Sequence, residues 1–295
     1  MNDLQKYLST CLLATAALLG GASPAFAADA PSLGAASEFA VLGGTNVTCT
    51  TGSVVTGDVG VSPGSAVPFT NTGCTIAGAT PPETDAAAAQ ARTDFLSAYA
   101  ALQLQSTSCT AVWGDLAGQN LAPGVYCLDA VAKAGTLTLT GPSDGVWIFL
   151  VYGALTGTDF AVVMDGGGQP CNVFWAPSTA ATMTTSAFKG NILAGDAIGG
   201  SITLTGGTLA GRALANVAVT MTGASVIGCD ALSDSPSCKG KKHHGHDKEH
   251  KKCNQGVGNG PEGCDPGNSN QGNPSRSNDE HRGTPGDPGR RGGNK

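Results

Sequence analysis

The stretch "SITLTGGTLAG", residues 201–211, alternates apolar and threonine side chains and then turns through two glycines. Ile202 and Leu204 lie on one side of an extended chain while Thr203 and Thr205 lie on the other, which is the two-residue period of a half-buried strand. The outward side, where soluble proteins usually place charges, carries only hydroxyl and methyl groups. The stretch therefore predicts a strand with an uncharged outer surface, and it raises the question of what that surface contacts.

The same alternation recurs along the chain at a near-constant interval. Three apolar strands are predicted about twenty residues apart, starting at Asn172, Asn191 and Arg212. A Thr-x-Thr triplet follows each strand, at residues 182–184, 203–205 and 220–222. A repeat of this length with the same side apolar each time indicates a solenoid, in which every turn buries its inward side chains against its neighbours. The sequence therefore predicts a mainly β fold built as a parallel β-helix, and we assign "TLTLTG" at residues 136–141 to a further turn.

One segment has a different character. Residues 85–105 contain no glycine or proline and are rich in alanine. Phe95, Tyr99 and Leu102 recur at helical spacing, and prolines and acidic residues come at the start, where a helix N-terminus favours them. We therefore predict one amphipathic helix over about residues 83–105, which packs its apolar stripe on the rest of the domain.

The N-terminus differs from the region that follows it. Lys6 precedes a short apolar run, and the Ala-Phe-Ala at residues 25–27 fits the small-x-small cleavage pattern, so residues 1–27 are predicted to be a signal peptide. The run is too short for a permanent anchor, and no other segment is apolar enough to cross a membrane. We expect a folded domain over residues 28–229 and a secreted protein, extracellular or periplasmic.

Residues 230–295 form a low-complexity tail. It opens with a His/Lys-rich block and continues with Gly, Pro, Asn and Ser, a composition that buries too little apolar area to offset the entropy of ordering. We therefore expect the tail to be disordered. The histidines at residues 243–246 lie near Cys238 and Cys253, but they lack the fixed spacing and closed fold of a structural zinc site. We prefer a solvated basic tract without metal, one that contacts polysaccharide or another acidic surface.

Cysteine usage indicates an oxidising compartment. Six cysteines lie between residues 28 and 229 without a Cys-x-x-Cys pair, which indicates disulfides rather than zinc ligands. Spacing alone leaves many pairings open. We favour Cys109–Cys127, because the segment between them has the length of about one solenoid turn, whose ends return to the same edge.

Charge and residue types exclude several functions. Residues 28–229 contain four basic side chains against twelve acidic ones, a net charge of −8, so the domain lacks the basic stripe that nucleic acid requires. All five histidines lie in the tail, which excludes Ser-His-Asp and Cys-His catalysis within the domain. Asp159, Asp165 and Asp196 are candidates for convergent catalytic carboxylates, but their small, Gly-rich neighbours favour turns. We therefore expect a protein that is not an enzyme and uses no cofactor.

The threonines are the chemical feature that remains. Residues i and i+2 of a strand stand about 6.7 Å apart on one face and neighbouring strands lie about 4.8 Å apart, so stacked Thr-x-Thr turns form a flat grid of hydroxyl and methyl groups. Threonine is stiff at χ1, so the grid is ordered before anything binds. Such an uncharged grid lets water adopt a lattice, and ice is its natural solid partner. The simpler interpretation, that threonine is favoured on exposed strands in general, stays open.

The candidate binding residues lie on the predicted flat face near residues 179–225. Arg212 is the one charged residue between residues 197 and 229, so this face is nearly free of charge. The candidates are Thr179, Thr182, Thr184, Thr203, Thr205, Thr208, Thr220 and Thr222.

Several motifs, in order, resemble those of one known family: "LGAASEFAVLGGTNVT", "GDVGVSPGSAV", "APGVYCLDA", "CNVFW", "GNILA" and "GRALANVAVT". They are similar to the ice-binding-like (antifreeze) proteins, a secreted microbial family of discontinuous β-solenoids, from about Ser32 to Cys229. The resemblance implies a right-handed β-helix of triangular section with one long helix alongside, no cofactor, and adsorption to ice. Some members carry Thr-Ala/Gly-x-Thr/Asn on the ice-facing side, which residues 179–182 and 205–208 match.

The sequence leaves three functions to compare. A secreted ice-binding protein, acting as a monomer through its Thr-rich face, is the function that we expect. The first alternative is an extracellular adhesion or matrix protein that binds glycan or a surface through the domain or the tail. The second is a carbohydrate-active β-helix enzyme.

Overall fold

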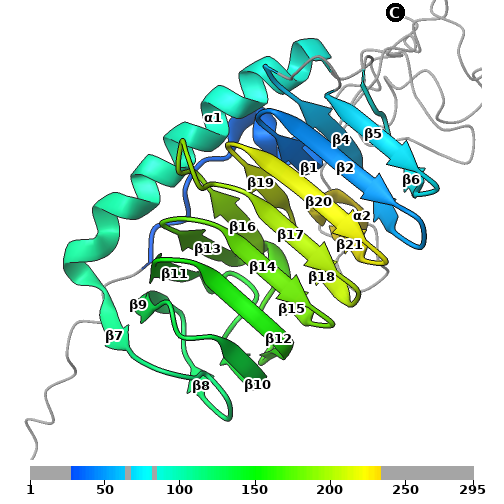
Figure 1. Ribbon diagram of the computed structural model, residues 1–295. Coiled ribbons are helices and arrows are strands. Elements are labelled where there is room, and N and C mark those ends of the chain that lie inside the picture. Colours follow the sequence, from blue (N-terminus) through cyan, green and yellow to red (C-terminus); the bar gives the residue numbers. More distant parts are fainter. Residues whose placement is uncertain (1–27, 64–67, 82–84, 234–295) are drawn as a thin grey trace, which may run out of the picture. The chain divides into compact units, whose positions relative to one another are not determined.

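The computed structural model describes residues 28–63, 68–81 and 85–233. In this part of the chain, parallel strands wind into a β-helix with three faces, and one long helix lies along it (Figure 1). The predicted mainly β solenoid with a long helix alongside is therefore confirmed. The predicted signal peptide and nearly all of the predicted tail, with its metal and polysaccharide predictions, lie outside the described residues.

The first face of the solenoid, face A, is a sheet of eight parallel strands. In spatial order they are β4 (Asp58–Val61), β1 (Phe39–Gly43), β19 (Ala213–Ala215), β16 (Asn191–Ala194), β13 (Val173–Pro177), β11 (Trp147–Tyr152), β9 (Gly124–Asp129) and β7 (Thr110–Val112). The three strands predicted from the twenty-residue repeat, β13, β16 and β19, are neighbours in this sheet, as the solenoid requires.

The other two faces share one long strand, β12 (Leu155–Asp165), which bends from one face to the next. Face B consists of the first half of β12 with five further strands: β5 (Phe69–Thr72), β2 (Asn46–Thr50), β20 (Ala218–Thr222), β17 (Ile202–Thr205) and β14 (Ala181–Thr184). Face C consists of the second half of β12 with seven further strands: β6 (Thr75–Ala77), β3 (Val54–Thr56), β21 (Ser225–Ile227), β18 (Thr208–Ala210), β15 (Ala187–Lys189), β10 (Lys133–Thr140) and β8 (Asn120–Leu121). "TLTLTG" lies largely in β10, on face C.

The coils do not stack in sequence order. The first coil, β1 to β3, pairs with the last coil, β19 to β21, on all three faces. The second coil, β4 to β6, then stacks outside the first. Helix α1 (Asp85–Gln103) follows the second coil in sequence and leads the chain along the solenoid to β7, at the other end of face A (Figure 1).

Inward side chains of all three faces form one apolar core. On face B the inward positions stack in register from coil to coil, as in Val47, Val219 and Ile202. Each coil is too small to bury these side chains alone, and stacking removes them from water. Aromatic rings fill part of the core, where Phe149 and Trp175 stack with ring centroids 4.0 Å apart.

Helix α1 buries the outer side of face A. Phe95 and Leu102 from the helix pack against outward side chains of the sheet, among them Leu150 and Phe174. Tyr99 is half-buried and donates a hydrogen bond from its hydroxyl to the carbonyl of Pro177. The predicted apolar stripe therefore packs as expected, and face A is closed to any other partner along the helix.

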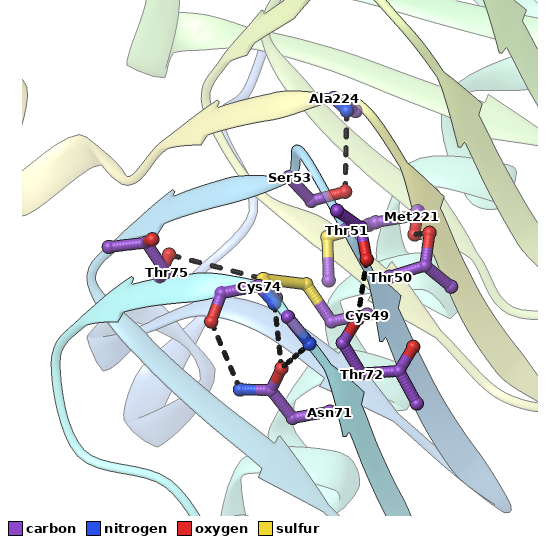
Figure 2. The surroundings of a disulfide bond; sticks show 11 residues. Cys49, Thr50, Thr51, Ser53, Asn71, Thr72, Cys74, Thr75, Met221 and Ala224 are labelled. Atoms are coloured by element: carbon purple, nitrogen blue, oxygen red, sulfur yellow. Dashed lines mark hydrogen bonds between the residues drawn. A yellow bond between two sulfur atoms is a disulfide. The ribbon is translucent and has the colours of Figure 1, made fainter.

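Three disulfides brace the solenoid. The predicted Cys109–Cys127 bond is present, together with Cys49–Cys74 and Cys171–Cys229. Cys49 points inward from β2, and Cys74 lies in the corner that joins β5 to β6 (Figure 2). The Cys49–Cys74 bond therefore ties the outermost coil to the one beneath it.

The short helix α2 (Cys229–Ser233) closes the described part of the chain. It extends four residues past Cys229, into the segment that the sequence analysis assigned to the tail. Three short 3-10 helices complete the elements of the described residues: η2 (Gly34–Glu38), η3 (Leu104–Ser108) and η4 (Pro170–Asn172). Among the residues described, neither helix is both long and apolar enough to cross a membrane.

Candidate functional site

Face B carries two straight rows of threonines, one side chain from every strand in each row. The strands share the pattern apolar-Thr-x-Thr, in which the apolar residue points inward and both threonines point outward. The residue x is buried in every strand except β5, where it is the exposed Asn71. The first row is Thr156, Thr182, Thr203, Thr220, Thr48 and Thr70. The second row is Thr158, Thr184, Thr205, Thr222, Thr50 and Thr72. We call these twelve residues the threonine grid.

The geometry of the grid follows from ordinary strand spacing. Five strand-to-strand steps of about 4.8 Å give each row a length of about 24 Å, and the two rows lie about 6.7 Å apart. The pairing along face B runs without a bulge, so the rows stay straight. Four of the six residues in the second row are exposed, whereas the first row is half-buried.

The grid hydroxyls are largely free to bond to water. Among the described residues, Thr50 is the grid member whose hydroxyl donates within the protein, to the carbonyl of Met221 at 3.1 Å (Figure 2). Thr48 accepts a longer bond, 3.4 Å, from the side-chain amide of Asn46. The grid therefore presents an array of donors, acceptors and methyl groups without a charged member.

A sharp corner ends the second row and separates face B from face C. Gly206 and Gly207 follow Thr205 with positive φ angles of 62° and 68°. A β-carbon at Gly207 would lie 2.2 Å from the carbonyl oxygen of Ser186 in the next coil, so no larger residue fits there. In the adjacent coils Thr185 and Asp159 take the same left-handed conformation, and the Thr185 hydroxyl donates to the Asp159 carboxylate.

Six of the eight predicted site residues lie in the threonine grid, and two do not. Thr179 lies in the turn before β14, at the corner between faces A and B. Thr208 begins β18, on face C, because the Gly206–Gly207 corner turns the chain before it is reached. The placement of these two on the flat face is therefore wrong. The Thr-x-x-Thr tetrapeptides at 179–182 and 205–208 cross corners, so their two ends do not share a face.

Six grid residues were missed by the sequence analysis: Thr48, Thr50, Thr70, Thr72, Thr156 and Thr158. Their signal is present as "VTCT", "FTNT" and "LTGT" at residues 47–50, 69–72 and 155–158. The first two segments lie before α1, outside the regular twenty-residue repeat. Their alignment depends on the first coil stacking on the last, which sequence spacing does not reveal.

The three candidate carboxylates lie apart. Asp159 and Asp165 are six residues apart at opposite ends of an extended segment of β12, a separation of about 20 Å. Asp196 lies in the loop between β16 and β17, where its carboxylate accepts the backbone N–H groups of Ile198 and Gly199. These bonds lower the pKa of Asp196. The three carboxylates therefore do not converge, and the turn interpretation holds for Asp196, whereas Asp159 and Asp165 lie in β12.

Metal ligands do not gather in the described part of the chain. No group of three or more His, Cys, Asp or Glu side chains there is arranged to hold a metal ion. All six cysteines of residues 28–229 form disulfides. The threonine grid is therefore the candidate site that remains among the described residues.

The family model of ice-binding-like proteins matches residues 41–227. The chain belongs to the ice-binding-like family. The resemblance found in the sequence motifs is thus confirmed, and the matched segment contains the whole threonine grid. Among curated members, an ice-binding protein of Nostoc sp. (strain HG1) is 39% identical over 217 residues, 71% of this chain and 78% of that protein. One of Flavobacterium frigoris (strain PS1) is 34% identical and covers 65% of this chain and 74% of its own length.

Solved structures of ice-binding-like proteins share the fold. An ice-binding protein from an Antarctic biological consortium aligns with a TM-score of 0.57 at 31% identity, over 70% of this chain and 95% of its own. A second structure, from the Antarctic ascomycete Antarctomyces psychrotrophicus, aligns with a TM-score of 0.56 at 30% identity, over 68% and 98%. The β-solenoid with its accompanying helix is therefore the fold that this chain shares with them.

Proposed function

We propose that the protein binds ice through the threonine grid of face B. The observation that carries this proposal is the register: two rows of six threonines each, straight and uncharged, on a face that α1 does not cover. The names of the related ice-binding proteins support it. The simpler interpretation, a general preference of threonine for exposed strands, does not explain why the same two outward positions hold threonine in all six strands.

The spacing and chemistry of the threonine grid suit it to binding ice. Its repeats of about 4.8 Å and 6.7 Å are close to oxygen–oxygen repeats in the ice lattice. The methyl groups repel liquid water while the hydroxyls hold water molecules in place, so an ordered layer forms that merges with the crystal. Charged side chains would instead orient water around each ion. β-Branched threonine has few rotamers, so its side chain is already ordered before ice binds. Binding therefore costs little side-chain entropy.

Adsorption at many points stops crystal growth without any chemical reaction. Ice between bound molecules must grow as a curved front, and curvature lowers its local melting point. One uninterrupted grid on one chain is sufficient for this, so we infer a monomer that works without cofactor or catalysis. The signal-like N-terminus and three disulfides support a secreted protein.

A cold-stage experiment on the purified full chain tests the proposal. A single ice crystal in the protein solution is expected not to grow within a range of temperatures below its melting point, which is the thermal hysteresis gap. In a second assay, polycrystalline ice held in the protein solution is expected to keep small grains. A heat-denatured sample of the same protein is the control. Growth of the crystal at the rate seen in buffer, with normal grain coarsening, would refute ice binding.

A further inference from the structure

A second surface stands out at the corner between faces A and B, away from the threonine grid's centre. The sheet register aligns Val112 with Leu128 and Asp129 with Tyr152, so the residue that follows β7 and the last residues of β9 and β11 form a row. That row is Trp113, Asp129 and Tyr152, which we call the aromatic patch. The Trp113 and Tyr152 side chains are 60% and 50% exposed.

The two rings of the patch lean toward each other. Trp113 and Tyr152 belong to strands two apart, a separation of about 9.6 Å, yet their ring centroids are 6.5 Å apart with the planes tilted by 36°. The other described tryptophans, Trp147 and Trp175, are fully buried. Leaving two large rings in water forgoes the stabilisation of burial, so a paired exposure on a rigid sheet end marks a contact site.

Hydrogen bonds and a neighbouring disulfide hold the aromatic patch rigid. The Asp129 carboxylate accepts the Gly114 backbone N–H at 2.9 Å and the Lys133 ammonium at 3.0 Å, which fixes the turn after Trp113. The hydroxyl of Tyr152 lies 3.1 Å from the sulfur of Cys127, which is bonded to Cys109. A surface built in advance in this way loses little entropy when a ligand binds.

Charge narrows the class of ligand. Lys133 is 1% exposed and its ammonium is engaged by Asp129 and the Gly114 carbonyl, so it offers nothing to an anion. Asp115, two residues from Trp113, is an exposed carboxylate. The patch therefore combines two aromatic faces with carboxylate acceptors and no accessible cation. This is complementary to a pyranose ring, whose C–H face stacks on an aromatic ring and whose hydroxyls donate to carboxylates.

We propose that the aromatic patch of Trp113, Asp129 and Tyr152 binds an uncharged polysaccharide by stacking two sugar rings. Uronic or sulfated chains are disfavoured because both nearby carboxylates repel them. The patch lies beside one end of the threonine grid, next to β12, so a matrix-bound molecule leaves most of face B free. A second copy of the chain is the competing occupant, and the test distinguishes it.

Native electrophoresis through gels that contain polysaccharide measures the binding directly. We expect retardation of the full chain by at least one neutral polymer among a mixed-linkage β-glucan, a mannan and a dextran, whereas retardation by alginate, the acidic polymer that suits the predicted basic tract of the tail, should be the same in Trp113→Ala. Trp113→Ala or Tyr152→Ala is expected to weaken the apparent affinity about tenfold or more, while Trp113→Phe retains most of it. Val163→Ala, which shortens an exposed apolar side chain on face C, is the matched control.

Tryptophan fluorescence provides a second readout. Of the three tryptophans that the structure describes, Trp113 is the one that is exposed. The polymer that retards the protein is therefore expected to shift the tryptophan emission to the blue and to protect it from iodide quenching. Trp113→Phe is expected to remove both effects. Three results would overturn the proposal: no retardation by any neutral polymer, retardation that survives Trp113→Ala, or concentration-dependent dimerisation abolished by Trp113→Ala without any polymer effect. Ice growth measured on the same variants is expected to stay unchanged, so failure here leaves the proposed function intact.

Discussion

Thr203 on β17 and Thr220 on β20 occupy the same position in adjacent strands, although the chain makes a full turn of the solenoid between them. Two equivalent steps relate Thr220 to Thr48 and Thr48 to Thr70, across a sequence gap that is closed by stacking the first coil on the last. Every step places a threonine at the equivalent position of the next strand. The threonine grid is thus a property of the coil register rather than of any one strand.

A bulky residue near the middle of the grid should damage ice binding more than one at its edge. The ring introduced by Thr220→Tyr prevents ice from contacting the threonines of the strands on both sides. Thr70→Tyr, on the outermost strand β5, leaves most of the grid flat. We expect Thr220→Tyr to remove nearly all thermal hysteresis and Thr70→Tyr to leave a substantial fraction. Equal losses in the two variants would mean that the binding surface is not centred on face B.

The Cys49–Cys74 disulfide should protect the edge of the grid. Replacing both cysteines with alanine removes the covalent tie between the outermost coil and β2, with an expected cost of about 3 kcal/mol in unfolding free energy. Amide hydrogen exchange in β5 and β6 should accelerate and hysteresis should fall partly, because Thr70 and Thr72 lose their fixed positions.

The matched control for this change is the pair Cys109→Ala and Cys127→Ala, which removes a disulfide of similar span on face A. That variant is expected to unfold at lower temperature while keeping its ice activity. If both double variants lost the same share of thermal hysteresis, measured well below their melting temperatures, the role of the Cys49–Cys74 disulfide in holding the edge of the grid would be contradicted.

Arg212 should stabilise the fold without contributing to the site. Its guanidinium is buried, donating to the Ser37 carbonyl at 2.9 Å and to the Asn191 amide oxygen at 3.1 Å. Burial lowers the pKa of Arg212. Arg212→Met leaves both acceptors without this donor, so we expect a loss of about 2–4 kcal/mol, visible as a lower melting temperature. Lys189→Met is the control and should change stability little; hysteresis of both variants should match the wild type.

Ice activity and stability should respond differently to acid. The grid contains no titrating group, so hysteresis should not change with pH while the fold persists. Backbone hydrogen bonds from Ala134, Gly114 and Gly199 hold the pKa values of Asp115, Asp129 and Asp196, respectively, below their usual 3.8. A lowered pKa in the folded state stabilises the fold above pH about 4, and this contribution disappears as pH falls through the folded value. Melting temperature should therefore decline only below pH about 4; a decline centred near pH 6 would contradict this assignment.

Local patterns made the fold and half of the grid predictable. Apolar alternation in residues 202–205 and the repeat that begins at Asn172 predicted parallel coils, and the alanine-rich segment around Phe95 predicted α1. Those signals depend on neighbouring residues in sequence, and the structure confirms them.

Long-range register and corner geometry were not predictable in the same way. Thr48 joins the grid because its coil stacks on residues 218–222, and nothing in its own surroundings shows this. Thr208 leaves face B because two glycines turn the chain, so that two residues alike in sequence pattern, Thr205 and Thr208, end on different faces. The carboxylate and lysine contacts that fix the turn after Trp113 likewise appear only in three dimensions.

The most direct test of ice binding through face B compares two single substitutions by thermal hysteresis. Thr203→Tyr places a ring in the middle of the threonine grid, and Thr208→Tyr places the same ring at an exposed threonine five residues away, on face C. We predict that Thr203→Tyr abolishes hysteresis while Thr208→Tyr keeps it near the wild-type value, with equal melting temperatures for the two. Activity that survives Thr203→Tyr, or is lost in Thr208→Tyr alone, would contradict the assignment of the ice-binding surface to face B.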